Sequence, residues 1–159
     1  EGNQNNSGAY SIAAGIWKGN TSLSFASSQE TSYIDFKTAF KVSESFNVAL
    51  NAHIADYEEN PSTDYPQPGS GFTSISAYPQ IKSSDSMSWG MRLEYIMFED
   101  FVNDVSVFTP TLTANYTVGA LTIKPELRLD SASEDIFTDN DGAAAGGLTA
   151  FRLGAVYSF

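Results

Sequence analysis

Residues 87–98 read MSWGMRLEYIMF, and large apolar side chains fill every second position of this segment. The apolar positions are Met87, Trp89, Met91, Leu93, Tyr95 and Met97. The first four positions between them are Ser88, Gly90, Arg92 and Glu94. A strict period of two predicts a β-strand with one apolar and one polar face. The segment is also longer than the usual strand of about 5–6 residues.

The same alternation recurs along the whole chain. It predicts nine strands, at residues 9–18, 21–27, 33–42, 46–57, 72–82, 87–98, 106–117, 120–130 and 148–159. The fifth is the least regular because Pro79 has no N–H to donate to a sheet ladder. The fold class we expect is all-β, an antiparallel meander that forms a transmembrane β-barrel.

The charges follow the polar faces of the predicted strands. Six of the eight basic residues lie there, and the apolar faces carry charge only at their rims, at Lys18 and Asp56. A charge facing lipid at mid-depth would cost about 2–4 kcal/mol. A soluble β-sandwich also alternates, but its strands are shorter. Aromatic residues near the ends of the apolar faces further favour a membrane barrel, as interfacial anchors.

Composition excludes several other classes. Mean hydropathy is −0.20, and no run approaches the roughly 18 apolar residues of a membrane-spanning helix. The formal net charge of −11 argues against a nucleic-acid partner. The chain has no cysteine, which excludes disulfides and thiolate metal sites. We expect no cofactor.

The connections between the predicted strands alternate in length. Short turns are predicted at 18–21, 42–46, 82–87 and 117–120. Longer links are predicted at 27–32, 58–71, 99–105 and 131–147. Outer-membrane barrels of Gram-negative bacteria have short periplasmic turns and long exterior loops. This pattern therefore predicts the bacterial outer membrane as the location of the protein.

Nine strands conflict with the even number of an ordinary barrel whose ends both face the periplasm. Either residues 9–18 do not span, which leaves eight strands, or an upstream part of the barrel is missing. We favour the second reading because residues 9–18 alternate well. Residues 1–159 are then one transmembrane β-barrel domain that forms the C-terminal part of a larger barrel.

Two stretches carry a resemblance to a known family. Residues 91–95 (MRLEY), followed by acidic residues 99–100, are similar to an "R-x-E-Y … D" strand and loop. Residues 111–116 (TLTANY) and 121–130 (LTIKPELRLD) resemble a "T-L-x-x-x-Y … L-x-x-x-P-E-L-R-x-D" hairpin. Both patterns belong to the putative β-barrel porin-2 family, also called OmpL-like. Lys124 departs from the arginine that is commoner there.

The resemblance covers about the last 70 residues and implies an outer-membrane porin. Members of the family are usually much longer than 159 residues, which also implies a C-terminal part of a larger barrel. The chain closes on LGAVYSF, residues 153–159. An alternating last strand that ends in a residue such as Phe159 is similar to the signal read by the outer-membrane assembly machinery. We expect that machinery, lipid and lipopolysaccharide as partners, with a homo-oligomer or another envelope protein left open.

Polar-face side chains are the candidate functional residues. The expected lumen-lining set is Asp35, Lys37, Lys41, His53, Arg92, Glu94, Lys124, Glu126, Arg128, Asp130 and Arg152. In a wide barrel such residues line water and set ion preference. In a narrow barrel they pair with one another and fill the interior.

Enzyme and metal chemistry find little support in the sequence. His53 is the only histidine, and no nucleophile elbow accompanies it. We therefore expect a polar wall residue and no enzyme. Asp139 and Asp141 resemble the start of a calcium loop but lack the distal glutamate, so a solvated loop is the simpler reading.

The sequence is compatible with two functions. The first is a porin for passive diffusion of small hydrophilic solutes or ions through a charged, water-filled lumen. The alternative is a small closed structural barrel that anchors a partner through its extracellular loops.

Overall fold

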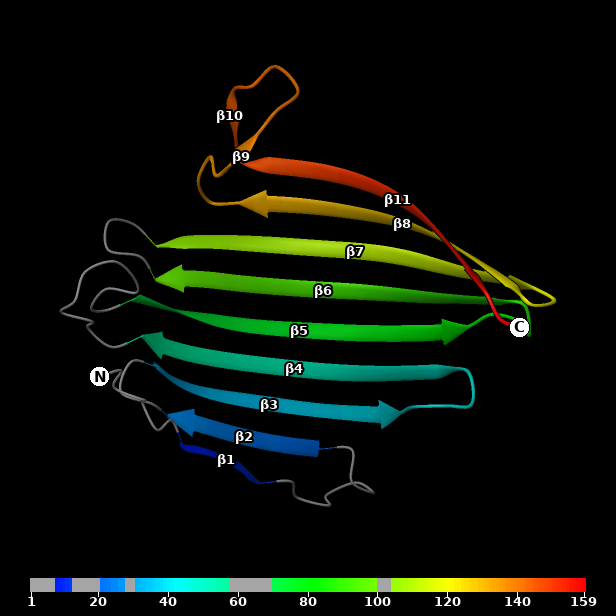
Figure 1. The fold of residues 1–159 in the computed structure, drawn as a ribbon, viewed down its shortest axis with the longest axis horizontal. Helices are drawn as coiled ribbons and strands as arrows, with labels where there is room; N and C mark the ends of the chain where they lie inside the picture. The colour runs from blue at the N-terminus through cyan, green and yellow to red at the C-terminus, as the bar shows by residue number, and fades with distance from the viewer. Residues whose placement is uncertain (1–7, 13–20, 28–30, 58–69, 100–103) are drawn as a thin grey trace, which may run out of the picture.

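The computed structural model describes residues 8–12, 21–27, 31–57, 70–99 and 104–159. Nine antiparallel strands form one sheet in meander order, β1-β2-β3-β4-β5-β6-β7-β8-β11 (Figure 1). Their bounds are β1 (Gly8–Ile12), β2 (Thr21–Ser27), β3 (Thr31–Lys41), β4 (Phe46–Tyr57), β5 (Ser70–Lys82), β6 (Met87–Glu99), β7 (Val105–Val118), β8 (Leu121–Ala132) and β11 (Gly147–Tyr157). No helix in the described part of the chain is long and apolar enough to cross a membrane.

The strands agree closely with the predicted segments. β2 and β4 have the predicted bounds, and β3, β5, β6, β7, β8 and β11 differ by no more than two residues at either end. β1 covers the start of the predicted 9–18 strand, and residues 13–18 lie outside the described residues. The all-β antiparallel meander is thus confirmed.

A second, two-stranded sheet was not predicted. It pairs β9 (Phe137–Thr138) with β10 (Ala144–Ala145), inside the predicted 131–147 loop. Strands of two residues are too short to show a period of two, so sequence alternation does not reveal them. In Figure 1 this hairpin stands beyond the ends of β8 and β11.

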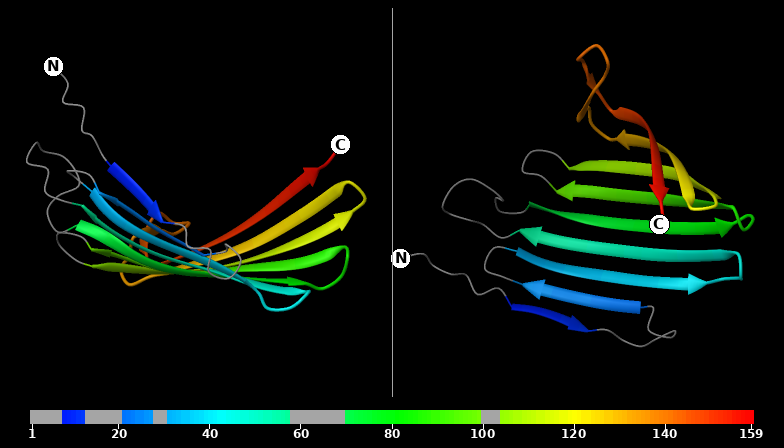
Figure 2. Two further views of the ribbon diagram at one scale, coloured as in Figure 1. Left: turned by 90° about the horizontal axis from the view of Figure 1, so that it is seen from below. Right: turned by 45° about the vertical axis from the view of Figure 1, so that its right-hand side comes forward.

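The sheet curves into an open trough (Figure 2). Its edge strands are β1 and β11, and no ladder joins these two strands among the described residues. The described strands therefore form an arc of wall that does not close on itself. Along the arc, each strand after the first pairs with its predecessor in the sheet over most of its length.

Three of the four predicted tight turns, at 42–46, 82–87 and 117–120, occupy one end of the trough, and residues 18–20 of the fourth lie outside the described residues. Two of them share a pattern of lysine, any residue, serine, an acid, serine and an apolar residue, as KVSESF at 41–46 and KSSDSM at 82–87. In each, the lysine binds the acidic residue three positions on, with Lys41 Nζ 2.8 Å from Glu44 and Lys82 Nζ 2.7 Å from Asp85. At the other end the links are longer, except that β2 and β3 are joined by residues 28–30 alone. The predicted alternation in link length is wrong for that one connection.

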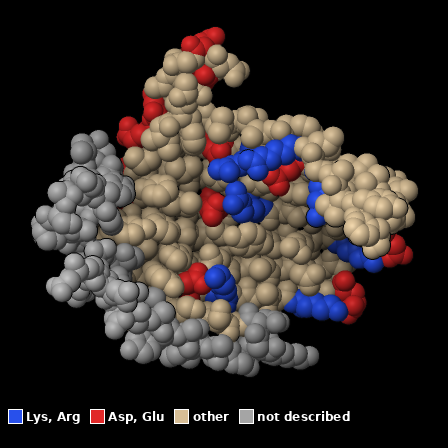
Figure 3. All heavy atoms as spheres, viewed as in Figure 1, with Lys and Arg blue, Asp and Glu red and all other residues tan. Residues whose placement is uncertain are grey.

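The two faces of the sheet differ in polarity. The convex face exposes large apolar side chains, including Ile75 (61% exposed) and Phe151 (69%). Charged residues gather in the hollow of the concave face (Figure 3). Small polar residues are buried there, with Ser76 only 2% and Thr109 only 3% exposed. A soluble sandwich would bury the apolar face instead, so this pattern is the reverse of that alternative.

Candidate functional site

All eleven predicted lumen-lining residues lie on the concave face. The strand registers place them on β3, β4, β6, β8 and β11. They do not form one group: Lys41 belongs to the turn pair with Glu44, Lys124 lies apart, and the others divide between two clusters along the sheet. Lys124 is exposed on β8, near the turn end.

The first cluster surrounds Asp35, which is only 7% exposed. Its carboxylate accepts hydrogen bonds from Lys37 Nζ at 2.7 Å and from Asn51 Nδ2 at 2.8 Å. His53 Nδ1 lies 3.4 Å from the same carboxylate. A buried carboxylate is tolerated where its oxygens are paired in this way. The charged groups here are therefore engaged with one another.

An aromatic row continues from this cluster on the concave face. His53 stacks between Tyr33 and Phe72, with ring centroids 5.5 Å and 5.1 Å apart. Phe98 extends the row, with its ring centroid 6.2 Å from that of Phe72. This row was not predicted from the sequence. The sequence did contain a signal for it, because three aromatic residues occupy polar-face positions of their strands, namely Tyr33, Phe72 and Phe98.

The geometry around His53 tests whether this histidine could belong to a catalytic triad. Ser74 is its cross-strand neighbour, so the order Asp35, His53, Ser74 runs across three strands. No hydrogen bond joins His53 to Ser74 within the described residues. A triad needs the base within reach of the nucleophile. The imidazole here is held in a stack of rings and lies beside a carboxylate.

The concave-face charges pair along single strands. Arg92 Nη1 lies 3.2 Å from Glu94, and Arg128 Nε lies 2.9 Å from Asp130. Residues two apart share a face of a strand, which makes such pairs possible. In both pairs, as in Lys37 with Asp35, the acid lies nearer the long-link end of the sheet. Each of these three basic residues is therefore paired with an acid of its own strand.

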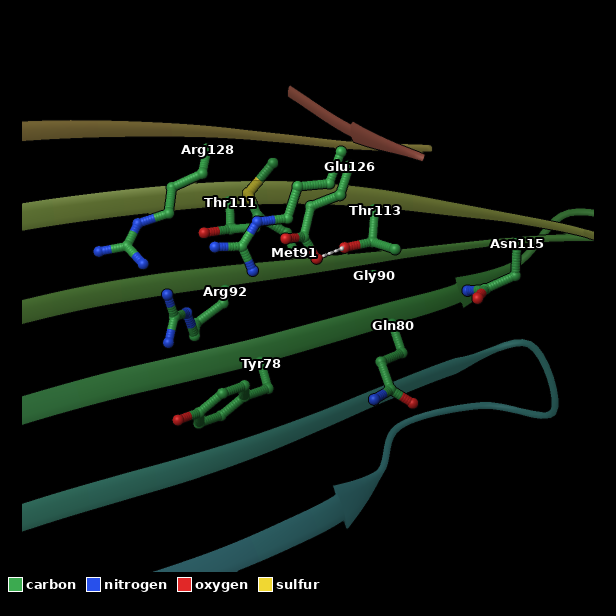
Figure 4. A pocket seen from close by; sticks show the side chains of 11 residues that line it. Tyr78, Gln80, Gly90, Met91, Arg92, Thr111, Thr113, Asn115, Glu126 and Arg128 are labelled. Atoms are coloured by element: carbon green, nitrogen blue, oxygen red, sulfur yellow. Dashed lines mark hydrogen bonds between the residues drawn. The ribbon is translucent and has the colours of Figure 1, made fainter. Parts of the chain in front are cut away.

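The second cluster surrounds a cavity of about 490 Å³ in the concave face (Figure 4). Its lining comes from β5, β6, β7, β8 and β11 and includes Arg92, Arg128 and Arg152. A smaller cavity of about 210 Å³ shares Gly90, Gln80 and Asn115 with it, toward the turns. The two cavities therefore adjoin in the half of the trough nearer the turns.

Two features of the backbone accompany this hollow. A Cβ added to Gly90 would meet no atom within 4 Å, so the missing side chain leaves open space. The β5–β6 ladder also skips Tyr78 and Pro79, opposite Met91 and Arg92. Proline has no N–H for a ladder bond, and inside a sheet it leaves such a gap.

Polar groups in the second cluster are only partly paired. Glu126 accepts a hydrogen bond from Thr113 Oγ1 at 3.0 Å. Among the described residues, Thr111 Oγ1 and Asp130 Oδ2 are buried and have no hydrogen-bond partner. Buried polar atoms normally find a partner in protein or ordered water. The second cluster thus retains unused hydrogen-bonding capacity.

The weak calcium candidate has another role in this structure. Asp139 Oδ1 accepts hydrogen bonds from the backbone N–H groups of Asp141 and Ala143, at 2.9 and 2.8 Å. This bonding stabilises the tip of the β9–β10 hairpin, as an Asx turn does. Within the described residues, no group of three or more His, Cys, Asp or Glu is placed to hold a metal ion.

Comparison with known proteins places the chain in a family. No curated protein and no solved structure matches it. The family model described as Putative beta-barrel porin-2, OmpL-like, matches residues 3–159. The match extends well beyond the last 70 residues in which the resemblance was visible, and it agrees with the antiparallel meander. This chain therefore belongs to the putative beta-barrel porin-2, OmpL-like, family.

Proposed function

We propose that this protein is an outer-membrane porin through which small hydrophilic solutes or ions diffuse passively. The proposal rests on the burial of the two faces of the sheet, which is the reverse of that in a soluble β-sandwich. Convex side chains such as Ile75 are exposed, while concave ones such as Ser76 are buried. An apolar outer surface suits contact with acyl chains, and a polar inner surface suits contact with water.

The pairing of the charges supports an open lumen over a filled barrel. In a narrow barrel, opposite charges would meet across the interior. Here the pairs Asp35–Lys37, Arg92–Glu94 and Arg128–Asp130 each lie along one strand. The missing side chain of Gly90 leaves open space on the same face. These three pairs are neutral without a partner from an opposite wall.

We further propose that the barrel contains strands besides those described. The edges β1 and β11 both lack a second neighbour among the described residues, and an unpaired edge within lipid is costly. Closure by additional strands would satisfy both edges. The intact mass of the native polypeptide tests this proposal. A mass of 17.2 kDa would count against it and favour a small closed barrel.

Single-channel recording tests the porin function. We expect the purified protein to give discrete, salt-dependent conductance steps in a planar lipid bilayer. A silent bilayer with correctly folded protein would contradict the proposal and favour a structural barrel that docks a partner. A chain that stays folded and monomeric in detergent-free buffer would contradict the membrane assignment itself.

A companion assay separates transport from hydrolysis. We propose that the protein works without covalent chemistry, with His53 serving as a wall residue in the aromatic row. Ester hydrolysis by the purified protein that disappears in His53→Ala would contradict this. Conductance steps in the same His53→Ala preparation would show that the variant had folded.

A further inference from the structure

The chain carries only three arginines, and all three line the same cavity. The formal net charge is −11, yet Arg92, Arg128 and Arg152 come from three different strands to one hollow of about 490 Å³. The register sets Arg92 opposite Thr111 and Thr111 opposite Arg128. Figure 4 shows these two arginines on either side of Thr111.

The three arginines have N–H donors that no ion pair uses among the described residues. A guanidinium has five N–H donors. Arg92 and Arg128 each bind one carboxylate, and the Arg128 bond uses Nε, which leaves both terminal nitrogens. Arg152 has no ion pair within the described residues, although it faces Glu126 across the β8–β11 ladder. The Glu126 carboxylate is engaged by Thr113 instead, as the dashed line in Figure 4 marks.

Thr111 adds an independent observation. It lines the cavity, is only 6% exposed, and its hydroxyl has no hydrogen-bond partner in the described part of the chain. A polar group held in this state costs free energy unless something pairs with it. It stands between two arginines, where an acceptor oxygen would find both a hydroxyl donor and guanidinium donors.

We propose that this cavity is a binding site for small solutes that carry a carboxylate or phosphate group. Guanidinium forks match the oxygen pairs of these anions, and that match is more specific than a point charge. Gln80 and Asn115, on the turn side of the cavity, offer amide groups to hydroxyls of the same solute. The inference rests on the proposed porin function and names the class of solute that its wall recognises.

Citrate and inorganic phosphate are the probes, with sorbitol as the uncharged control. We expect citrate to bind the detergent-solubilised protein in calorimetry and to reduce its conductance in planar bilayers. Arg152→Gln removes the guanidinium that has no ion pair, and it should weaken citrate binding about tenfold, as loss of a charge-assisted hydrogen bond does. Arg152→Lys, which keeps the charge but loses the fork, should fall between the two.

Lys41→Gln provides the matched control. It removes one positive charge from the β3–β4 turn, outside the cavity, and should leave citrate binding unchanged. Equal citrate affinity in the wild type, Arg152→Gln and Arg92→Gln would overturn the proposal, as would sorbitol binding of similar strength. Heat-modifiable mobility on gels would show that each variant is folded.

The two proposals fail in distinguishable ways. Arginine-dependent citrate binding by a protein that gives no conductance would support the site and refute the porin. Clear conductance without arginine-dependent binding would refute the site and leave the porin standing.

Discussion

On the convex face Ile75 and Phe151 expose 61% and 69% of their surface, whereas on the concave face Ser76 and Thr109 expose 2% and 3%. Ile75 and Ser76 are adjacent residues of β5, so the face to which each side chain points decides its exposure. Apolar burial within the protein therefore cannot be what holds this sheet together. The backbone ladders hold the strands in place, and in the membrane location that we propose the apolar face would contact hydrocarbon.

The concave face itself divides into two contrasting clusters. At Asp35 the carboxylate is surrounded by Lys37, Asn51 and His53, so its hydrogen bonds are used internally. In the cavity lined by the three arginines, the Arg152 guanidinium has no ion pair and the Thr111 hydroxyl has no hydrogen-bond partner among the described residues. The difference suggests that the first cluster stabilises the wall and the second is available to a solute.

A charge placed on the convex face should give the largest loss of stability. Leu50→Lys puts an ammonium on the convex face and should destabilise the protein by about 2–4 kcal/mol. Ala49→Lys, the adjacent residue on the concave face, is the control and should change stability far less. Denaturant unfolding in lipid vesicles measures both. Equal losses for the two variants would contradict the assignment of the faces.

Removing the centre of the first cluster should have the next largest effect. Asp35→Ala leaves Lys37 without its acceptor and removes one of the two acceptors of Asn51 Nδ2, so it should cost about 1–3 kcal/mol. Arg152→Gln, in the second cluster, should change stability by less than about 0.5 kcal/mol because it breaks no ion pair. The same unfolding assay compares them. A larger loss for Arg152→Gln would reverse the roles we give to the two clusters.

Filling the hollow should alter transport without altering stability. Gly90→Phe adds a large side chain where a Cβ would meet open space. Stability should stay within about 0.5 kcal/mol of the wild type, and conductance should fall measurably. Unchanged conductance in a folded variant would show that the solute path does not pass this part of the wall.

The smallest effect is expected at the turn end of the sheet. The hydrogen bond from Lys82 and the charge of Lys82 lower the pKa of Asp85. The pair therefore contributes stability at pH values above the usual carboxyl pKa, and this contribution is lost as the pH falls through the lowered pKa. Lys82→Gln should return the pKa of Asp85 to its ordinary value. Titration of the Asp85 side chain by NMR measures it. Global stability should not change detectably, because exposed pairs contribute little.

Much of the fold could be read from the sequence because a period of two is a local property. It located the eight strands from β2 to β8 and β11 within two residues, and it assigned the charged residues to one face. It failed where the local signal is too short, as in the β9–β10 hairpin. The prediction was weakest at Pro79. There the β5–β6 ladder skips two residues, but β5 continues because it stays paired with β4 through Pro79 and with β6 before and after the gap.

The sequence by itself determined which side chains face each way, since neighbouring residues of a strand point to opposite faces whatever the strand's partners are. Only the tertiary structure decided which of them meet. The row from Arg92 through Thr111 to Arg128, and the stack of His53 between Tyr33 and Phe72, both depend on the register between strands. Register joins residues distant in the chain, and their spacing along the sequence does not encode it.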